Sequence, residues 1–259
     1  MPRRRCGFTL LELLIVISIM TTLLATLAPA LQLAHRQAKR VACAGNLRAL
    51  GSAVIHYAMS DGEVPVTAQR FAGRRDRPDL AANLIYHRPT GFDLGASLES
   101  YVHPSGLNCP EARQGVYRAP SPTTETVYSS YIFLWGAVAG TPERGFDSID
   151  MAPPATLIAA DLAWNVYHNQ RFEFAGNHLR SGYHYPPTPF VLSDDVDPVG
   201  TQFNVPTPRA IAGIHAVYVD GSVRWVPRAR RAWRDAGPFH QGVYKDVRIY
   251  LPARSQHRK

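Results

Sequence analysis

An apolar run that contains one acidic residue dominates the N-terminal part of the sequence. From Phe8 to Ala34 the only charged side chain is that of Glu12, and three arginines at positions 3–5 precede the run. A helix needs about 20 apolar residues to cross a bilayer, so this run is long enough. Because a carboxylate in hydrocarbon costs about 3 kcal/mol, an acid at this position is expected to have a function.

The residues Gly7-Phe8-Thr9-Leu10-Leu11-Glu12, together with this run, resemble the N-terminal signature of type IV pilins and type II secretion pseudopilins. The resemblance implies that prepilin peptidase removes a basic leader, residues 1–7, by cutting after Gly7. It also implies N-methylation of the new first residue, Phe8, and a role for Glu12 in subunit assembly. The alternatives are an ordinary single-pass anchor and a signal peptide cut near Ala28-Pro29-Ala30.

A charged pair explains how Glu12 could serve assembly. A cut after Gly7 leaves a positively charged amine on Phe8, and an amine and a carboxylate inside a bilayer are tolerated when they pair. The amine of one subunit can therefore neutralise Glu12 of its neighbour, in a contact that repeats along a filament. Pro29 removes one backbone hydrogen bond and favours a kink, as in many pilin helices.

The helix is predicted to continue beyond the membrane part, which covers about residues 8–34. Asp61-Gly62 and Pro65 are stop signals, so we expect one helix over residues 8–60. Its second half carries an apolar stripe with helical spacing: Leu47, Leu50, Val54 and Tyr57. The remainder, residues 61–259, should form a loop-rich head with an antiparallel β-sheet, because the chain has 21 Pro and 19 Gly. The predicted class is therefore α+β and pilin-like.

The location and partners follow from the resemblance, because charge alone does not orient the helix. Arg36, Lys39 and Arg40 follow the apolar run and nearly balance the leader arginines. Prepilin peptidase acts on the cytoplasmic side, which implies a cytoplasmic N-terminus and an extracytoplasmic head on a bacterial inner membrane. The implied partners are other pilin subunits, the peptidase and an inner-membrane assembly platform.

Asp220-Gly221 is a strong signal for a hairpin turn. With Val219 opposite Ser222, one face of the hairpin would contain Ile214, Ala216, Tyr218, Val223 and Trp225, and we expect this face in the core. The other face would contain His215, Val217 and Arg224. Further strands are expected over Val127–Trp135, Thr156–Asp161 and Val243–Leu251, the last at a sheet edge, with a long surface loop over residues 186–208.

Parts of the head resemble a pseudopilin-like subfamily that is abundant in planctomycete-type bacteria. The similar stretches include residues 43–51, Leu107-Asn108-Cys109-Pro110 and the region around Asp220-Gly221. That subfamily has a histidine, nine residues and then Asp-Gly, but Ala210 occupies the histidine position here. Either His178 is its displaced counterpart, with an insertion in between, or His215 is an unrelated histidine, so the role of that histidine stays open for this chain.

The cysteines predict one cross-link. Cys6 lies in the leader and would be lost, whereas Cys43 and Cys109 remain in an oxidising compartment. We expect these two to form a disulfide that ties the helix to the head. The alternative is two buried thiols.

No spacing in the sequence matches an established metal or hydrolase motif. His168, His178 and His184 lie near Asp161 in the sequence, but without a zinc pattern. The acidic group of Asp194, Asp195 and Asp197 is expected to be a solvated loop, with calcium binding as the alternative. Gly-x-Ser-x-Gly is absent. We therefore expect no cofactor and no enzymatic activity.

The C-terminal segment, residues 228–259, is strongly basic, with nine Lys or Arg and two Asp. It contains no recognised nucleic-acid motif and is expected to be a solvated tail. The sequence thus favours a structural subunit of a type IV pilus or type II secretion pseudopilus. A DNA- or ligand-binding minor pilin is the first alternative, and a membrane-anchored enzyme is the second.

Overall fold

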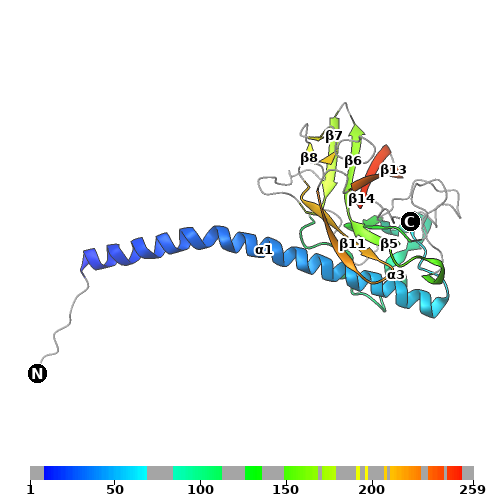
Figure 1. The fold of residues 1–259 in the computed structure, drawn as a ribbon, viewed down its shortest axis with the longest axis horizontal. Helices are drawn as coiled ribbons and strands as arrows, with labels where there is room; N and C mark the ends of the chain where they lie inside the picture. The colour runs from blue at the N-terminus through cyan, green and yellow to red at the C-terminus, as the bar shows by residue number, and fades with distance from the viewer. Residues whose placement is uncertain are drawn as a thin grey trace, which may run out of the picture.

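One long helix and a β-rich head make up the protein (Figure 1). The structure, a computed structural model, describes residues 9–68, 84–112, 126–135, 149–168, 171–178, 191–192, 196–197, 207–208, 211–228, 233–241 and 244–252. Helix α1 (Leu10–Asp61) extends far beyond the head on one side and packs beneath it with its other half. The predicted α+β class is confirmed.

Both ends of α1 are capped by their own residues. At the start, the Thr9 hydroxyl accepts a hydrogen bond from the Glu12 backbone N–H, and the Glu12 carboxylate accepts one from the Thr9 backbone N–H. At the end, Gly62 adopts a left-handed φ of 78° and donates its N–H to the Ala58 carbonyl. The described helix runs from Leu10 to Asp61, where the sequence predicted residues 8–60, and residue 8 lies outside the described residues. The helix continues through Pro29 along an arched course (Figure 1).

The two halves of α1 have different surroundings. Residues 9–35 are exposed along their whole length, whereas Leu47, Leu50 and Val54 are completely buried against the head. A Cβ atom at Gly51 would lie 2.7 Å from Cγ2 of Val217, so glycine permits the close approach of helix and sheet. The predicted apolar stripe is thus the face that packs under the head.

The strands in the described part of the head form four antiparallel sheets. The four-stranded sheet contacts α1 and has the order β12 (Val223–Pro227), β11 (Gly213–Tyr218), β5 (Leu157–Asp161) and β4 (Tyr131–Phe133). The five-stranded sheet has the order β13 (Trp233–Gln241), β14 (Tyr244–Pro252), β6 (Ala163–His168), β7 (Arg171–Gly176) and β8 (Val191–Leu192).

Smaller elements complete the described part of the head. A three-stranded sheet has the order β2 (Phe92–Asp93), β1 (Leu84–His87) and β3 (Thr126–Tyr128). The strands β9 (Val196–Asp197) and β10 (Thr207–Pro208) pair with each other. The short helices are α3 (Leu94–Leu98), η1 (Arg88–Thr90), η2 (Pro104–Leu107) and η3 (Ile149–Met151).

Two expected strands differ from the prediction. The run Val127–Trp135 is split into β3 and β4, which belong to different sheets. The chain bends at Ser130 between them, and the Ser129 hydroxyl donates to the Leu107 carbonyl. The predicted edge position of Val243–Leu251 is wrong, since β14 lies between β13 and β6. Residues 233–241 and 244–252 belong to the basic segment that was expected to be a solvated, partly ordered terminus, and the structure has them as strands of the head. The predicted loop over residues 186–208 contains β8, β9 and β10, and its other residues lie outside the described part.

The predicted hairpin pairing is wrong by one residue. In the structure His215 is opposite Trp225, Val217 is opposite Val223, and Tyr218 donates its N–H to the Ser222 carbonyl. The turn therefore has three residues, and Gly221 adopts a φ of 75°, as in a type I turn followed by a bulge. Asp220 accepts a hydrogen bond from the Ser222 N–H. The shift places His215 and Trp225 on the face toward α1, and both faces of β11 are buried.

Candidate functional site

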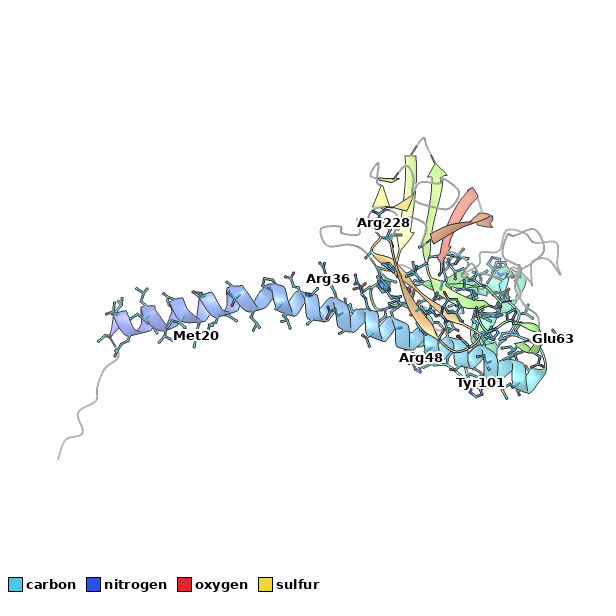
Figure 2. All side chains as sticks on the ribbon, viewed as in Figure 1. Met20, Arg36, Arg48, Glu63, Tyr101 and Arg228 are labelled. Carbon is cyan, nitrogen blue, oxygen red and sulfur yellow. The ribbon has the colours of Figure 1, made fainter. Side chains whose placement is uncertain are left out.

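The N-terminal segment forms the first candidate site. Gly7 and Phe8 lie outside the described residues, and Thr9 and Glu12 form the capping box at the start of α1. Apolar side chains cover the exposed half of the helix on all sides, around Met20 in Figure 2. Among the described residues this is one helix that is long and apolar enough to cross a membrane. The exposed half is suited to hydrocarbon and not to water.

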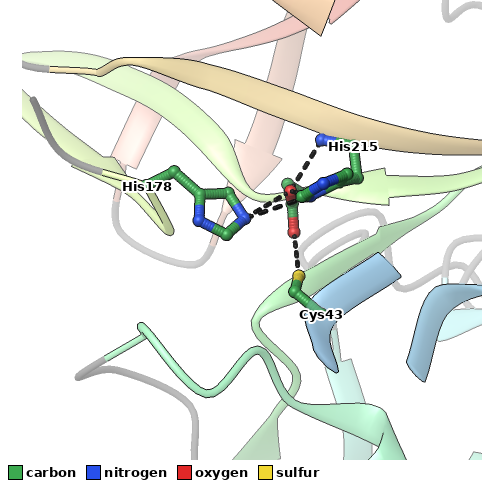
Figure 3. Close-up of side chains that lie close together, drawn as sticks. Cys43, His178 and His215 are labelled. Atoms are coloured by element: carbon green, nitrogen blue, oxygen red, sulfur yellow. Dashed lines mark hydrogen bonds and ion pairs between the residues drawn. The ribbon is translucent and has the colours of Figure 1, made fainter. Parts of the chain in front are cut away.

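A second candidate site lies in the core, where four potential metal ligands meet (Figure 3). Cys43 comes from the packed half of α1, Asp161 from the end of β5, and His215 from β11. His178 follows β7. All four residues are buried. The group therefore joins the helix to the four-stranded sheet.

Strand pairing explains why these side chains meet. Val217 pairs with Ala159, so the alternate residues His215 and Asp161 project toward α1 as well. His178 lies beside the start of β11, because its carbonyl accepts the N–H of Ala212 at 2.7 Å. The assignment of the head to the planctomycete-type subfamily stays a prediction.

The Asp161 carboxylate is at the centre of the cluster. Its Oδ1 accepts hydrogen bonds from Asn177 Nδ2 at 2.9 Å and from Cys43 Sγ at 3.1 Å. Its Oδ2 accepts the backbone N–H of His215 at 2.7 Å and lies 3.0 Å from Nδ1 of the same residue. Nε2 of His178 lies 2.9 Å from Oδ2 and 3.2 Å from Nδ1 of His215. Two imidazole nitrogens thus converge on one oxygen.

A second group of residues holds the His178 and His215 rings in place. Nδ1 of His178 is hydrogen-bonded to the Glu111 carboxylate. The Trp225 ring packs against both imidazoles, with centroid distances of 5.3 Å to His178 and 4.7 Å to His215. The Arg40 guanidinium lies over that indole at 4.8 Å. The two rings are therefore fixed in orientation by contacts on several sides.

Charge is concentrated on the Asp161–His178 pair. Burial by itself raises the pKa of the Asp161 carboxyl, but His178 and His215 together hold it well below its usual range. Burial by itself lowers the pKa of the His178 imidazole, but the adjacent Asp161 carboxylate raises it to about 12. The structure therefore favours an ionised aspartate beside an imidazolium, a buried pair that compensates its own desolvation.

The predicted disulfide is not present in the structure, in which Cys43 and Cys109 are both buried free thiols. Cys43 instead donates to Asp161 and lies 3.5 Å from the Tyr131 hydroxyl. Burial raises the pKa of the Cys43 thiol, and Cys109 and Asp161 raise it further. Burial also opposes ionisation of Cys109, but hydrogen bonds with Cys43 and His178 lower its pKa to about 6. Of the two thiols, that of Cys109 is therefore the more acidic.

Cys109 contacts His178, and His178 contacts Glu111, as the thiol, the imidazole and the carboxylate do in a cysteine catalytic triad. However, Cys109 Sγ lies 3.8 Å from His178 Nε2, whereas Asp161 Oδ2 lies only 2.9 Å from that nitrogen. The nitrogen that would accept a thiol proton is therefore engaged by a carboxylate. The thiol and the imidazole are also buried, which closes them to a substrate. The geometry suits ligation or structure better than nucleophilic catalysis.

The sequence predictions did not include this site. His178 lies near Asp161 in the sequence but without a zinc pattern. The predictions assigned Cys43 to a disulfide and placed His215 on the hairpin face opposite to the expected core face. His184, Asp194 and Asp195 lie outside the described residues, and Asp197 is described only as part of β9. The ligand atoms come from four separate parts of the chain, so no spacing motif could have indicated the complete set.

Comparison with known families identifies the N-terminal segment. The sequence model described as the prokaryotic N-terminal methylation motif matches residues 2–28, which include Gly7, Phe8 and Glu12. No curated protein and no solved structure matches the chain. The motif is that of subunits processed by prepilin peptidase, and it is followed here by the long apolar helix and the α+β head. The match over residues 2–28 supports a type IV pilin-like or pseudopilin-like protein.

Proposed function

We propose that the chain is a structural subunit of a type IV pilus or a type II secretion pseudopilus. Prepilin peptidase cuts it between Gly7 and Phe8 and methylates the amine of Phe8. The first half of α1 then holds it in the bacterial inner membrane, with the head on the extracytoplasmic side. Assembly transfers this helix from the bilayer to the helical core of a filament, where neighbouring subunits cover its apolar surface.

One observation supports this proposal most strongly: the contrast between the two halves of α1. The half up to residue 35 exposes apolar side chains that nothing in the described head covers, including Leu10, Leu23 and Leu31 at 60% or more. The other half buries Leu47, Leu50 and Val54 completely. A helix that packs with one half and offers the other half to lipid or to other helices is suited to storage in a membrane and to bundling.

The capping box gives Glu12 a partner within its own chain. Its carboxylate accepts the backbone N–H and the hydroxyl of Thr9, both at 2.8 Å. This contact lowers the cost of keeping the acid in the membrane before assembly, because the carboxylate is not left without donors. In the filament, the amine of a neighbouring subunit would supply a full positive charge instead.

Intact mass measurement of the membrane form tests the processing step. The chain should begin at Phe8 and carry one additional methyl group. A chain that still begins at Met1, in a host with an active prepilin peptidase, would refute the proposal.

Two substitutions separate the capping role of Glu12 from its charge. Glu12→Gln keeps a side-chain acceptor for Thr9 but removes the charge, whereas Glu12→Ala removes both. We expect both variants to be processed normally and to be lost from the sheared filament fraction, while the exposed head variant Glu99→Gln assembles like wild type. If Glu12→Gln assembles normally and Glu12→Ala does not, Glu12 acts as a cap only. Normal assembly of both variants would remove any role in the filament.

A further inference from the structure

We propose that the head binds one zinc-type divalent metal ion through Cys43, Asp161, His178 and His215. The ion would fasten α1 to the sheet that packs on it. This inference does not depend on the filament proposal, because it rests on the contacts between the packed half of α1 and the head.

The spacing of the ligand atoms fits a small ion. Oδ2 of Asp161, Nε2 of His178 and Nδ1 of His215 form a triangle with sides of 2.9, 3.0 and 3.2 Å. The corners of such a triangle lie about 1.8 Å from its centre, so an ion slightly above the centre contacts all three at about 2.0–2.1 Å, as zinc does. The ligand atoms of all four residues lie within 4.8 Å of one another. The Cys43 sulfur completes a tetrahedron when it moves toward the other three.

The donor set indicates the kind of metal. One thiolate, two imidazole nitrogens and one carboxylate oxygen are typical ligands of zinc and of related transition metals. Calcium and magnesium require oxygen ligands in larger number and are disfavoured by sulfur and nitrogen. The site therefore differs in place and in chemistry from the acidic loop considered for calcium in the sequence.

The outer partners of the ligands match those of a metal centre. His178 turns Nε2 toward the cluster and bonds through Nδ1 to Glu111, the carboxylate–histidine arrangement that fixes a metal-binding tautomer. Oδ1 of Asp161 accepts a hydrogen bond from the Asn177 amide, and Oδ2 faces the two imidazoles. Two ring nitrogens 3.2 Å apart that both face one carboxylate oxygen are arranged around a common point, where a cation can replace their protons.

Burial indicates a structural and not a catalytic ion. Cys43 and Asp161 are completely buried, and so is the His178 side chain, while His215 is 6% exposed. With four protein ligands no coordination position remains open for water or substrate, as in structural zinc sites. Because the ligands converge only in the folded head, the ion would bind as the head folds and would stabilise it.

Metal analysis of the full-length protein in detergent, purified under reducing conditions, tests the proposal. We expect one zinc ion per chain and a higher Tm with zinc than after chelation, with no such effect of calcium. Cobalt(II) should give the absorption of a tetrahedral site with a thiolate-to-metal band. That band should disappear in Cys43→Ser. The matched control is His56→Ala, which removes an exposed histidine of the same helix and should keep the ion.

Variants show which residues hold the ion. His215→Ala should lose zinc, and Glu111→Gln should bind it about 10–100-fold more weakly, as loss of an outer partner does. A wild-type chain that retains no zinc and shows no cobalt spectrum would overturn the proposal, and so would zinc that persists in both Cys43→Ser and His215→Ala. If a variant does not fold, the cobalt spectrum of the wild type decides: a thiolate band supports the site, and its absence refutes it. A metal-free membrane form whose mass shows a Cys43–Cys109 disulfide would also overturn it.

Discussion

Two glycines of the same helix provide a direct test of how α1 packs on the head. A Cβ at Gly51 would lie 2.7 Å from Cγ2 of Val217, whereas a Cβ at Gly45 would have nothing within 4 Å. Alanine is favoured over glycine in a helix by about 1 kcal/mol, and this gain applies at both positions. At Gly51 the added methyl also overpacks a dense core, which costs about 1–3 kcal/mol.

The expected result is that Gly45→Ala stabilises the protein and Gly51→Ala does not. Gly45→Ala should raise the free energy of unfolding by up to about 1 kcal/mol. Gly51→Ala should range from neutral to a loss of about 2 kcal/mol, because overpacking offsets the helical gain. Chemical unfolding of the full-length chain in detergent, followed by tryptophan fluorescence, measures both values.

A double-mutant cycle identifies Val217 as the cause. Val217→Ala removes the methyl group that the new Cβ would meet, so the loss caused by Gly51→Ala should shrink in the Val217→Ala background by about 1–3 kcal/mol. If Gly51→Ala stabilises the wild-type protein as much as Gly45→Ala does, the helix does not approach β11 as closely as described.

Two further predictions concern the four-stranded sheet that packs on the helix. Asp161→Asn in the metal-free chain should lower the free energy of unfolding at neutral pH by up to about 3–5 kcal/mol, because the buried imidazolium of His178 loses the carboxylate at Nε2 and keeps only Glu111 at Nδ1. The pKa of Asp161 lies below its ordinary value of 3.8, so the stabilisation that its carboxylate provides is present above that pH and is lost as the pH falls further. If the difference in the free energy of unfolding between Asp161→Asn and wild type stays constant below about pH 4, this reasoning is contradicted. Because Gly221 has a φ of 75°, Gly221→Ala should lower the free energy of unfolding by about 1–2 kcal/mol, and Gly221→Asn should lower it clearly less in the same assay. Equal losses for the two variants would show that the turn does not need the left-handed conformation.

Local signals predicted the helix well because they are local in the structure too. Thr9 and Glu12 form the cap of the helix that they begin, and Gly62 ends it through its own backbone. The stripe of Leu47, Leu50 and Val54 is buried because helical spacing decides which side chains share a face. These features depend on residues within four positions of one another, so the sequence contains them completely.

The cluster could not be predicted because it depends on one non-local detail. The Asp220-Gly221 pair allows a turn of two or three residues, and the choice decides which residues of β11 share a face with Val223 and Trp225 of β12. The three-residue turn puts His215 toward α1, where it meets Cys43 and Asp161. His178 arrives from a segment more than 30 residues earlier in the chain. No pattern within one segment contains this information.

The position of the cluster along α1 connects the two proposals. Cys43 follows the last residue of the apolar run, Ala34, by nine residues, which is about 14 Å of helix. It is the first residue of α1 that is completely buried in the head, counted from the membrane side. A pull on the exposed half, as in extraction of the helix from a bilayer, therefore acts first on the contact between Arg40 and Trp225 and then on the buried contact between Cys43 and the sheet. Apolar packing beyond this point is non-directional and yields side chain by side chain. A metal bonded to Cys43 on the helix and to His215 on β11 would instead hold both elements at one point. The head would then stay packed on the helix as the helix enters the filament.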